Sequence, residues 1–411
     1  MSFIVGNMLA VLAELPFTNY NMTGIFVIPT IEKGKNMLKK ISVLVLILFA
    51  VALFAADDTY QIVMLGDLHY DNVDCREPEM MKNLKDYQKY ELDRNLRSWR
   101  EDGESLKMLE AAGKMAEQLN APFVIQNGDF VQGDAGSEEM ATKMILSCMD
   151  TCKKYIHVPF IATKGNHDPR GKGANAAVNK TLPAFWSKEL NINPPLTRTT
   201  FAHRQGPDVF IFLDDISLGS QKKEKVNDKE IVTFPNLEYF ESLLKANADA
   251  RYTFIVCHLP IIPTSAERWI PFGGQKTDAQ RKYLLNLLCE HNAIILCGHI
   301  HANSFIEFEN EKGKVAQITC ISLFPSPNAA KMGRPNEGCV EKYMVRKSVK
   351  DEMAKNPAAW TDFLGPYMSG LKRYITLGGA GYCIVRISPD GVVNEYRSIL
   401  DPEYCTSIKM R

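Results

Sequence analysis

From about residue 59 onward, two kinds of hydrophobic pattern alternate along the chain. Short, nearly continuous apolar runs of strand length are separated by longer segments in which apolar residues recur every three or four positions, as on one face of a helix. The short runs predict strands at 60–67, 123–129, 160–166, 209–215, 252–258 and 293–299. The longer segments predict helices at 103–119, 137–155, 236–247 and 277–291. Strands that alternate with helices in this way indicate α/β architecture.

The pattern changes after residue 301, where the apolar runs become shorter and more widely spaced. These runs predict antiparallel strands near 303–309, 315–322, 381–387 and 392–398. The last two are joined across the turn sequence SPDG, which favours a hairpin.

Two segments, 71–102 and 325–375, fit neither pattern, and both follow predicted strand ends. Loops over a rigid scaffold commonly decide specificity. We therefore predict that these insertions form a partial lid over a site, with side chains such as Arg94, Arg97 or Trp99 facing the pocket. The alternative is that they only pad the edge of the fold.

Composition and charge narrow the classes of function. The chain has 411 residues, of which 45% are apolar and 23% charged, which are ordinary values for a globular protein. Lysine plus arginine and aspartate plus glutamate number 48 each, so no overall positive field attracts nucleic acid or an anionic membrane. We therefore expect no nucleic-acid partner, and any anion must be bound by a local group of side chains.

The amino-terminal region has the pattern of a secretory signal peptide that begins at Met37. Two lysines precede an apolar run at 41–53, and small residues follow it. We predict a signal peptide over 37–56, a mature single domain over 59–411, and an untranslated upstream extension over 1–36. The protein would then be secreted or periplasmic. The alternative is an uncleaved membrane anchor, although the apolar run is shorter than the ~20 residues that a spanning helix needs.

Ten cysteines follow this segment, and an exported protein can oxidise them to disulfides. Their spacing argues against a disulfide framework, because Cys257 and Cys297 lie inside apolar runs, where a cysteine acts as a small hydrophobic residue. Cys148 and Cys152, four apart on a predicted helix, either form a bridge or share one face. The chain has no CxxC pair, so a zinc ribbon has no support.

Polar side chains that can bind metal gather at the carboxyl ends of the predicted strands, where ligands bind in open α/β sheets. They are Asp67, His69, Asp129, Asn166, His167, Asp168, His258, His299 and His301. Taken singly, each motif has an ordinary explanation: a capping carboxylate for Asp67, a common turn for Asp129, and a core histidine for His258. Their joint occurrence at successive strand ends favours one common site.

Carboxylates, imidazoles and a carboxamide that converge without cysteine predict a site for divalent transition-metal ions. These ligands are too many for one ion, but two ions that share one carboxylate would use them well. Two ions ~3.5 to 4 Å apart are a common means of promoting in-line displacement at phosphorus. The sequence therefore predicts a dinuclear metal centre that acts on a phosphate ester.

The order of these motifs resembles that of the calcineurin-like metallophosphoesterase superfamily. The matching motifs are Asp67-x-His69, Gly128-Asp129, Gly165-Asn166-His167-Asp168, His258 and Gly298-His299-x-His301, within residues 60–301. The resemblance implies an α/β fold that is a four-layer α/β/β/α sandwich of two mixed sheets flanked by helices. It also implies that one ion is held by Asp67, His69, Asp129 and His301, and the other by Asp129, Asn166, His258 and His299.

The same resemblance implies a phosphoesterase that hydrolyses a small mono- or diester by attack of a hydroxide bridging the two ions, and the signal-peptide pattern predicts that it is exported. The ions would be divalent or of mixed valence, from manganese, iron or zinc. His167 would face the substrate phosphate, and Asp168 would either orient His167 or cap a helix. His69 resembles the cyclic-nucleotide and glycerophosphodiester branch, and residues 130–134 lack the tyrosine that colours purple acid phosphatases.

Two other functions remain open. A nuclease of the same superfamily is disfavoured by the neutral charge and the predicted export. A non-catalytic scaffold that keeps only the fold has no use for the complete ligand set. Outside that set, Arg170 either clamps phosphate or lies in solvent, and Trp269 either stacks on a substrate ring or packs in the core or at the rim.

Overall fold

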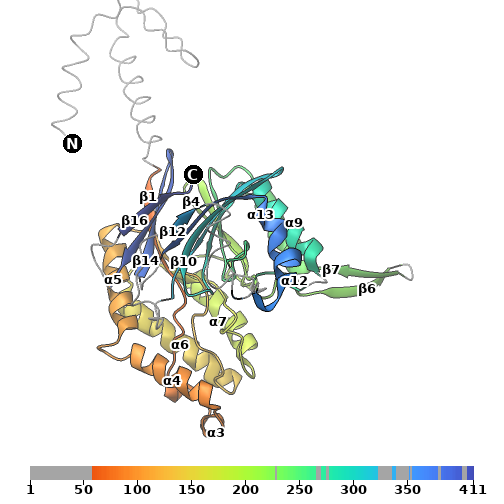
Figure 1. Cartoon of the computed structure of the whole chain (residues 1–411). Helices are drawn as coiled ribbons and strands as arrows, with labels where there is room; N and C mark the ends of the chain where they lie inside the picture. Colours follow the sequence, from red (N-terminus) through yellow and green to blue (C-terminus); the bar gives the residue numbers. More distant parts are fainter. Residues whose placement is uncertain are drawn as a thin grey trace, which may run out of the picture. The chain divides into compact units, whose positions relative to one another are not determined.

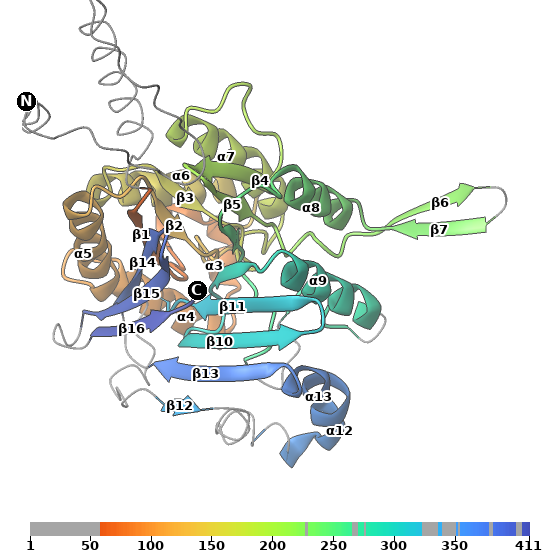
Figure 2. The ribbon, with the colours of Figure 1, turned by 90° about the horizontal axis from the view of Figure 1, so that it is seen from above.

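Two mixed β-sheets that pack face to face, with helices on their outer sides, make up the chain beyond residue 57 (Figures 1 and 2). The computed structural model describes residues 58–226, 229–264, 270–274, 277–322, 336–338, 351, 354–377, 381–399 and 405–411. The predicted signal segment, the extension before it, Trp269 and, within the second insertion, residues 325–335, 339–350 and 352–353 lie outside the described residues. No helix within the described ranges is long and apolar enough to cross a membrane.

The first sheet has the strand order β16-β15-β14-β1-β2-β3. Its strands are β1 (Tyr60–Leu65), β2 (Val124–Gln126), β3 (Phe160–Ala162), β14 (Gly381–Ser388), β15 (Gly391–Ser398) and β16 (Cys405–Lys409). β1, β2 and β3 are parallel, and the carboxy-terminal strands extend the sheet antiparallel from β1. Three helices lie against this sheet: α5 (Glu104–Gln118), α6 (Glu138–Tyr155) and α7 (Ala174–Glu189).

The second sheet has the order β12-β13-β10-β11-β9-β8-β5-β4. Its strands are β4 (Phe201–Gln205), β5 (Asp208–Phe212), β8 (Thr253–Val256), β9 (Ile294–Cys297), β10 (Asn303–Asn310), β11 (Gly313–Thr319), β12 (Asn336–Gly338) and β13 (Leu371–Leu377). Its centre is a parallel segment of four strands in the order β11-β9-β8-β5. The helices on its outer side are α8 (Pro235–Ala246), α9 (Asp278–Glu290), α12 (Pro357–Ala359) and α13 (Gly365–Met368), with the π-helical turn η3 (Trp360–Leu364).

Alternation along the central strands produces two apolar layers. Phe210 and Phe212 of β5 join the layer between the two sheets, whereas Val209 and Ile211 join the layer beneath α8 and α9. All four side chains are fully buried. Because both faces of such a strand are covered, its sequence is a continuous apolar run rather than an alternating one. The sequence pattern and the sandwich therefore have the same cause.

The predicted antiparallel hairpins near the carboxyl end and the six predicted α/β strands are present, but each of these six strands ends before its predicted carboxyl end. β3, for example, ends at Ala162 rather than at residue 166. The polar residues that follow leave the sheet, and two of them, Asp129 and His299, have positive φ. The predicted helices are present as α5, α6, α8 and α9, with ends shifted by a residue or two.

Several elements were not predicted from the hydrophobic pattern. They include α7, β4, β13, β16 and a hairpin of β6 (Lys222–Val226) and β7 (Lys229–Thr233) that projects from the body of the domain (Figure 2). The predicted helical stretch near 349–372 contains only the short α12, η3 and α13 in its described part, and β13 begins at Leu371.

The insertion at 71–102 folds into the 3₁₀ turn η1 (Val73–Cys75) and the helices α3 (Pro78–Lys82) and α4 (Asp86–Ser98). The prediction that Arg97 or Trp99 faces a pocket is wrong. Arg97 pairs with Asp93 on an exposed face of α4, and the Trp99 ring packs edge-on against Tyr70, 5.1 Å between centroids. Arg94 lies 6.0 Å from the ring of Tyr90, which is exposed.

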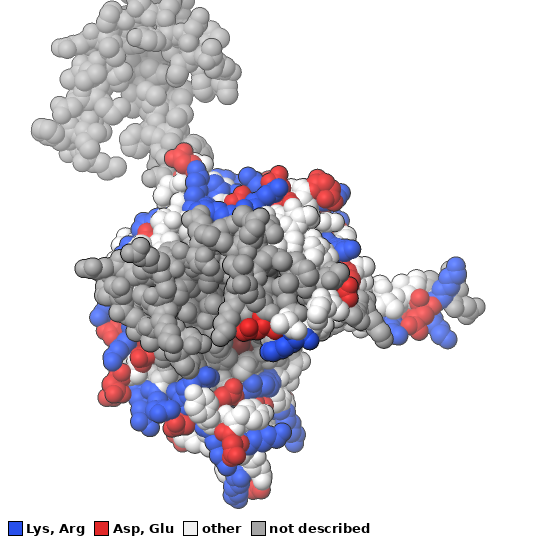
Figure 3. Space-filling view, viewed as in Figure 1, with Lys and Arg blue, Asp and Glu red and all other residues white. Residues whose placement is uncertain are grey.

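Charge is mixed on one face of the described surface. On the face shown in Figure 3, acidic and basic side chains are interspersed rather than gathered by sign. The cysteines that the structure describes are all free thiols, and Cys148 and Cys152 are both buried on α6. Their spacing therefore reflects two positions on one buried face.

Candidate metal centre

The residues singled out at the strand ends sit on strained backbone. His69, Asp129, His299 and His301 have φ of 44°, 51°, 71° and 45°, in the left-handed region that non-glycine residues rarely adopt. Each such residue costs on the order of 1–3 kcal/mol, and such strain concentrates at functional sites. Here it turns four polar side chains out of the sheets toward one another.

Two glycines allow these turns to approach closely. A Cβ on Gly165 would lie 2.0 Å from the backbone nitrogen of Asp129, and one on Gly298 would lie 2.4 Å from Oδ1 of Asp67. Neither position can carry a side chain without moving a predicted ligand. The glycines before the ligands therefore serve close packing of the loops.

The first cluster of side chains comprises Asp67, His69 and His301. Nε2 of His69 lies 2.9 Å from Nε2 of His301, which in turn lies 2.9 Å from Oδ2 of Asp67. Oδ2 of Asp129 lies 3.8 Å from Nε2 of His69. The structure thus brings together the four residues expected to hold one ion.

The second cluster forms around His258, which is fully buried. Its Nε2 lies 2.9 Å from Oδ1 of Asn166, 3.1 Å from Nδ1 of His299 and 3.3 Å from Oδ1 of Asp129. Its Nδ1 lies 2.8 Å from the carbonyl oxygen of Asn127, which accepts a hydrogen bond from it. That bond leaves Nε2 directed at the cluster, a common arrangement for a histidine that binds metal.

Asp129 lies between the two clusters and divides its carboxylate between them. Oδ2 faces His69 of the first cluster, and Oδ1 faces His258 of the second. A carboxylate whose two oxygens point at two separate sets of ligands has the geometry of a bridge between two ions.

The donor atoms fit metal ions in chemistry and in spacing. Two nitrogens that bind one ion at ~2.1 Å and at right angles lie ~3.0 Å apart. The nitrogen pairs His69–His301 and His258–His299 are 2.9 and 3.1 Å apart. Imidazole nitrogens with carboxylate and carboxamide oxygens suit manganese, iron or zinc.

The carboxylates and imidazoles of the two clusters stabilise each other's charged forms. Burial opposes ionisation of Asp67 and Asp129, but the neighbouring imidazoles, chiefly His301 and His258, outweigh it and hold both pKa values below the usual range. Burial likewise opposes the charge on His258, yet Asp129 raises its pKa to about 10. His258 must lose a proton from Nε2 to bind an ion there, so metal binding displaces a proton.

His167 lies beside the clusters, half-buried, with its ring edge-on to His69 at 4.6 Å between centroids. Its Nδ1 donates to the carbonyl oxygen of Gln132 at 3.1 Å, which leaves Nε2 directed elsewhere. Nη1 of Arg170 lies 3.4 Å from that Nε2. Burial lowers the pKa of His167, so its ring is neutral near pH 7 in the free site.

Asp168 does not have either role expected from the sequence. Its Oδ1 accepts from the amide of Val131 at 2.9 Å, and its Oδ2 accepts from the amide of Gly165 at 2.6 Å. The acceptor beside His167 is Gln132 instead, and the next helix, α7, begins with Gly173 as its cap. Asp168 therefore ties two ligand-bearing loops together rather than orienting His167.

The surroundings of Arg170 include residues that sequence reasoning missed. Nε of Arg170 lies 2.6 Å from Oδ2 of Asp134, and its Nη2 lies 3.9 Å from Oε2 of Glu91 on α4. Glu91 also accepts from Gln132 at 3.2 Å. Only the folded position of α4 brings Glu91 here, so no local sequence signal identifies it. Through Glu91, the 71–102 insertion reaches the edge of the site.

Comparison with known proteins agrees with this geometry. A family model described as calcineurin-like phosphoesterase matches residues 60–303, which is 244 of the 411 residues. A search of curated proteins found no match.

Solved structures with a similar chain course include a dimetal phosphatase from Danio rerio (TM-score 0.45, 13% identity, 86% of this chain and 99% of that chain). Another is GAP50, the anchor in the inner membrane complex of Plasmodium (TM-score 0.44, 14% identity, 86% of this chain and 89% of that chain). A third is PhoD (TM-score 0.44, 10% identity, 85% of this chain and 68% of that chain). Because the family model spans more than half of the chain and includes both clusters, the chain belongs to the calcineurin-like phosphoesterases and is a hydrolase of phosphoric ester bonds.

Proposed function

We propose that this protein is an exported phosphoesterase that depends on two metal ions and cleaves a small phosphate mono- or diester. The observation that carries the proposal is the position of Asp129, whose two carboxylate oxygens face His69 and His258 in separate clusters. A structural site for a single ion has no need of a carboxylate shared in this way. A scaffold without catalytic activity has no need of either cluster.

One ion would be held by Asp67, His69, Asp129 and His301. The other would be held by Asp129, Asn166, His258 and His299. Manganese, iron or zinc in divalent or mixed-valence states suit these donors. Bound there, two cations would lower the pKa of water and neutralise charge on the phosphoryl oxygens.

His167 is positioned to move a proton at its Nε2. Its Nδ1 is occupied by Gln132, so Nε2 is the nitrogen that changes protonation. An anionic ester beside the ring raises the pKa of His167, and Nε2 then gains a proton that it can pass to the leaving oxygen. The neutral ring of the free site and the charged ring of the complex differ by one proton, and the negative charge of the substrate favours binding of that proton.

Arg170 supplies a fixed positive charge next to that nitrogen. Asp134 and Glu91 orient its guanidinium, and one third of the side chain is exposed. We infer that Nη1 binds a phosphoryl oxygen of the ester. Arg170→Met should raise KM for an anionic ester at least tenfold, whereas Arg204→Met, at an exposed arginine of β4, should not change it. An unchanged KM in Arg170→Met would contradict this role.

The substrate branch and the export rest on the sequence. His69 resembles the cyclic-nucleotide and glycerophosphodiester branch, which favours a diester, and the pattern at 37–56 favours secretion. The mixed charge on the face shown in Figure 3 gives no support to the alternative of a nuclease.

The test is hydrolysis of nitrophenyl phosphate and of bis-nitrophenyl phosphate by the mature chain, before and after chelation. We expect hydrolysis of at least one ester, its loss on chelation, and its return with manganese. A higher kcat/KM for the diester would support the diesterase branch. A metal-loaded, folded protein that hydrolyses neither ester would contradict the proposed function.

A further inference from the structure

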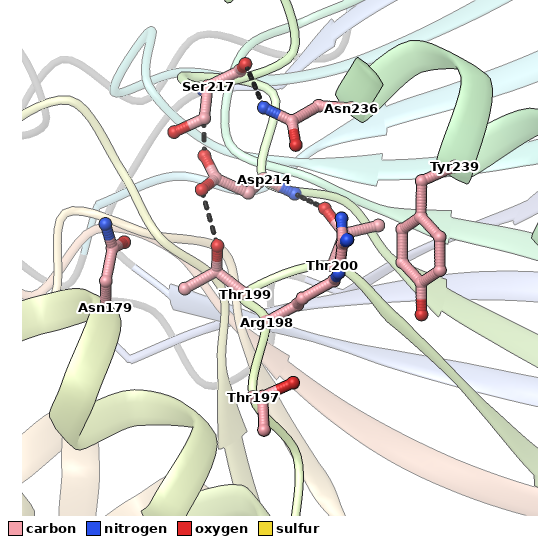
Figure 4. Close-up of a pocket in the computed structure, with 9 residues that line it drawn as sticks. All are labelled: Asn179, Thr197, Arg198, Thr199, Thr200, Asp214, Ser217, Asn236 and Tyr239. Carbon is pink, nitrogen blue, oxygen red and sulfur yellow. Dashed lines mark hydrogen bonds between the residues drawn. The ribbon is translucent and has the colours of Figure 1, made fainter.

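A small polar pocket lies beside the metal centre, at the carboxyl ends of β3 and β5. Its volume is about 210 Å³. Figure 4 shows Asp214 between Ser217 and Thr199, with Asn179 of α7 on one side and Tyr239 of α8 on the other. Pockets for drug-sized ligands hold ~300–1,000 Å³, so this one suits a single small group.

One lining residue of the pocket, Asp214, belongs to a buried ion pair. Nζ of Lys164 lies 3.0 Å from Oδ2 of Asp214, and the two side chains are 1% and 4% exposed. The same ammonium donates to Oδ1 of Asn179 at 3.1 Å and to Oγ of Ser217 at 2.9 Å. Burying two charges is costly, and this pair is fully engaged in fixing polar side chains around the cavity.

The pocket shares its foundations with the metal centre. Lys164 is two residues before Asn166, so their backbones lie within ~7 Å of each other. Asp215, next to Asp214, accepts from the amide of Leu259 at 2.6 Å, and Leu259 directly follows His258. The pocket therefore adjoins the side of the centre that Asn166 and His258 form.

Donors and acceptors alternate around the cavity. The hydroxyl of Ser217 accepts from Lys164, so its own proton remains to be donated, and the amide of Asn179 keeps an N–H in the same way. Thr199 donates to Asp214 at 2.6 Å and keeps its oxygen lone pairs. Nδ2 of Asn236 donates to the backbone carbonyl oxygen of Ser217, which leaves the Oδ1 of Asn236 as an acceptor.

Such a lining matches neighbouring hydroxyl groups, each of which both donates and accepts a hydrogen bond. It does not match an alkyl chain, because none of the lining residues is aliphatic and the guanidinium of Arg198 lies over the Tyr239 ring at 4.5 Å. We propose that this pocket binds the hydroxyl-bearing alcohol of the ester, a sugar or polyol, an inference that rests on the proposed phosphoesterase function.

The test compares esters that have the same phosphate but different alcohols. The metal-loaded chain is given esters of glycerol, glucose and butanol, as monoesters or methyl diesters according to the class it hydrolyses. The butyl ester is the reference because its leaving group resembles glycerol but lacks the extra hydroxyls. We expect kcat/KM to be about tenfold or more higher for the glycerol or glucose ester than for the butyl ester.

Variants of the lining should reduce that preference alone. Asn179→Leu, at an exposed position of α7, should lower kcat/KM for the glycerol or glucose ester about fivefold and leave the butyl ester unchanged. Ala184→Leu, five residues later on the same helix, also exposed and not part of the pocket lining, is the matched control and should change neither. Asn236→Leu, from α8, is a second variant with the same expected effect as Asn179→Leu.

A binding measurement separates failure of this inference from failure of the proposed function. Methyl glucoside should show saturation-transfer NMR signals with the parent chain and weaker signals with Asn179→Leu, whether or not any ester is hydrolysed. No glucoside binding, or equal rates for glycerol and butyl esters in an active enzyme, would overturn the inference while the phosphoesterase function stands. Glucoside binding without a rate preference would overturn the assignment of the pocket to the alcohol of the ester.

Discussion

Replacing Arg76 tests how the 71–102 insertion is held to the domain. Arg76 is 4% exposed and forms a bidentate pair with Asp71, which is 0% exposed, at 2.9 Å and 2.8 Å. Its Nη1 also donates to the carbonyl oxygen of Asp134 at 2.9 Å. Arg76→Met would leave Asp71 buried without a charged partner, with a 3.5 Å contact from Asn95 and a hydrogen bond from the backbone of Asn72. Removing one partner of a buried pair costs about 3–5 kcal/mol.

The assay is urea unfolding at fixed metal concentration, with Arg97→Met as the control. Arg97 and Asp93 form an exposed pair, 57% and 63% exposed, whose loss should cost less than about 1 kcal/mol. Arg76→Met combined with Asp71→Leu should recover most of the lost stability, because no buried charge remains.

The loss in Arg76→Met should also depend on pH. Burial already raises the pKa of Asp71 despite Arg76, and it rises further without that arginine. A folded-state pKa above the unfolded value means that the folded protein binds the proton more tightly, so the variant should lose stability as pH rises. A variant within about 1 kcal/mol of the parent at pH 8 would refute the reasoning.

The remaining predictions concern the catalytic histidine, a buried carboxyl and the amino terminus. His167→Ala should lower kcat by about 10²–10⁴ with unchanged metal content, whereas His157→Ala, at an exposed histidine, should leave kcat unchanged. Loss of metal in His167→Ala would show that the assigned role is wrong. Burial raises the pKa of Asp215 to about 7, so stability of the metal-free protein should fall as pH rises from about 4 to about 7, and Asp215→Asn should flatten that profile in urea unfolding; an unchanged slope would count against this. Amino-terminal sequencing of the natural product should find a start between about residues 53 and 59, and retention of 1–36 would refute the predicted export.

The central strands and the convergence of the candidate ligands could be predicted from the sequence because one physical cause produces both signals. A strand buried on both faces is a continuous apolar run, as in β8 and β9, and a polar residue that ends such a run stands at the carboxyl edge of the sheet. His258 and His299 were therefore recognisable without knowledge of the fold.

Elements whose stability depends on tertiary contacts could not be predicted in this way. α7 contains Pro183 and scattered polar residues, and it is held by contacts such as the buried Trp186. β6 and β7 are largely charged, so their sequence lacks the apolar signal of a strand. At such places tertiary packing outweighs the intrinsic secondary-structure propensity of the sequence.

The finer features of the site depend on contacts between distant segments. Glu91 lies near Arg170 in an insertion that also contains the buried Arg76–Asp71 pair, and neither contact has a local sequence signal. Lys164 gives no sign in the sequence that its charge is buried against Asp214, 50 residues away. For Asp168, adjacency to His167 suggested a hydrogen bond, but the carboxylate binds backbone amides instead.

The central claim is tested most directly by the number of metal ions per chain. The mature protein, reconstituted with manganese and freed of excess metal, should contain close to two ions by plasma mass spectrometry. Asp129→Ala should lose both, because its two oxygens face both clusters, whereas Asp93→Ala, at an exposed aspartate, should keep two. One ion or fewer in the parent, or two ions retained in Asp129→Ala, would contradict a dinuclear centre bridged by Asp129.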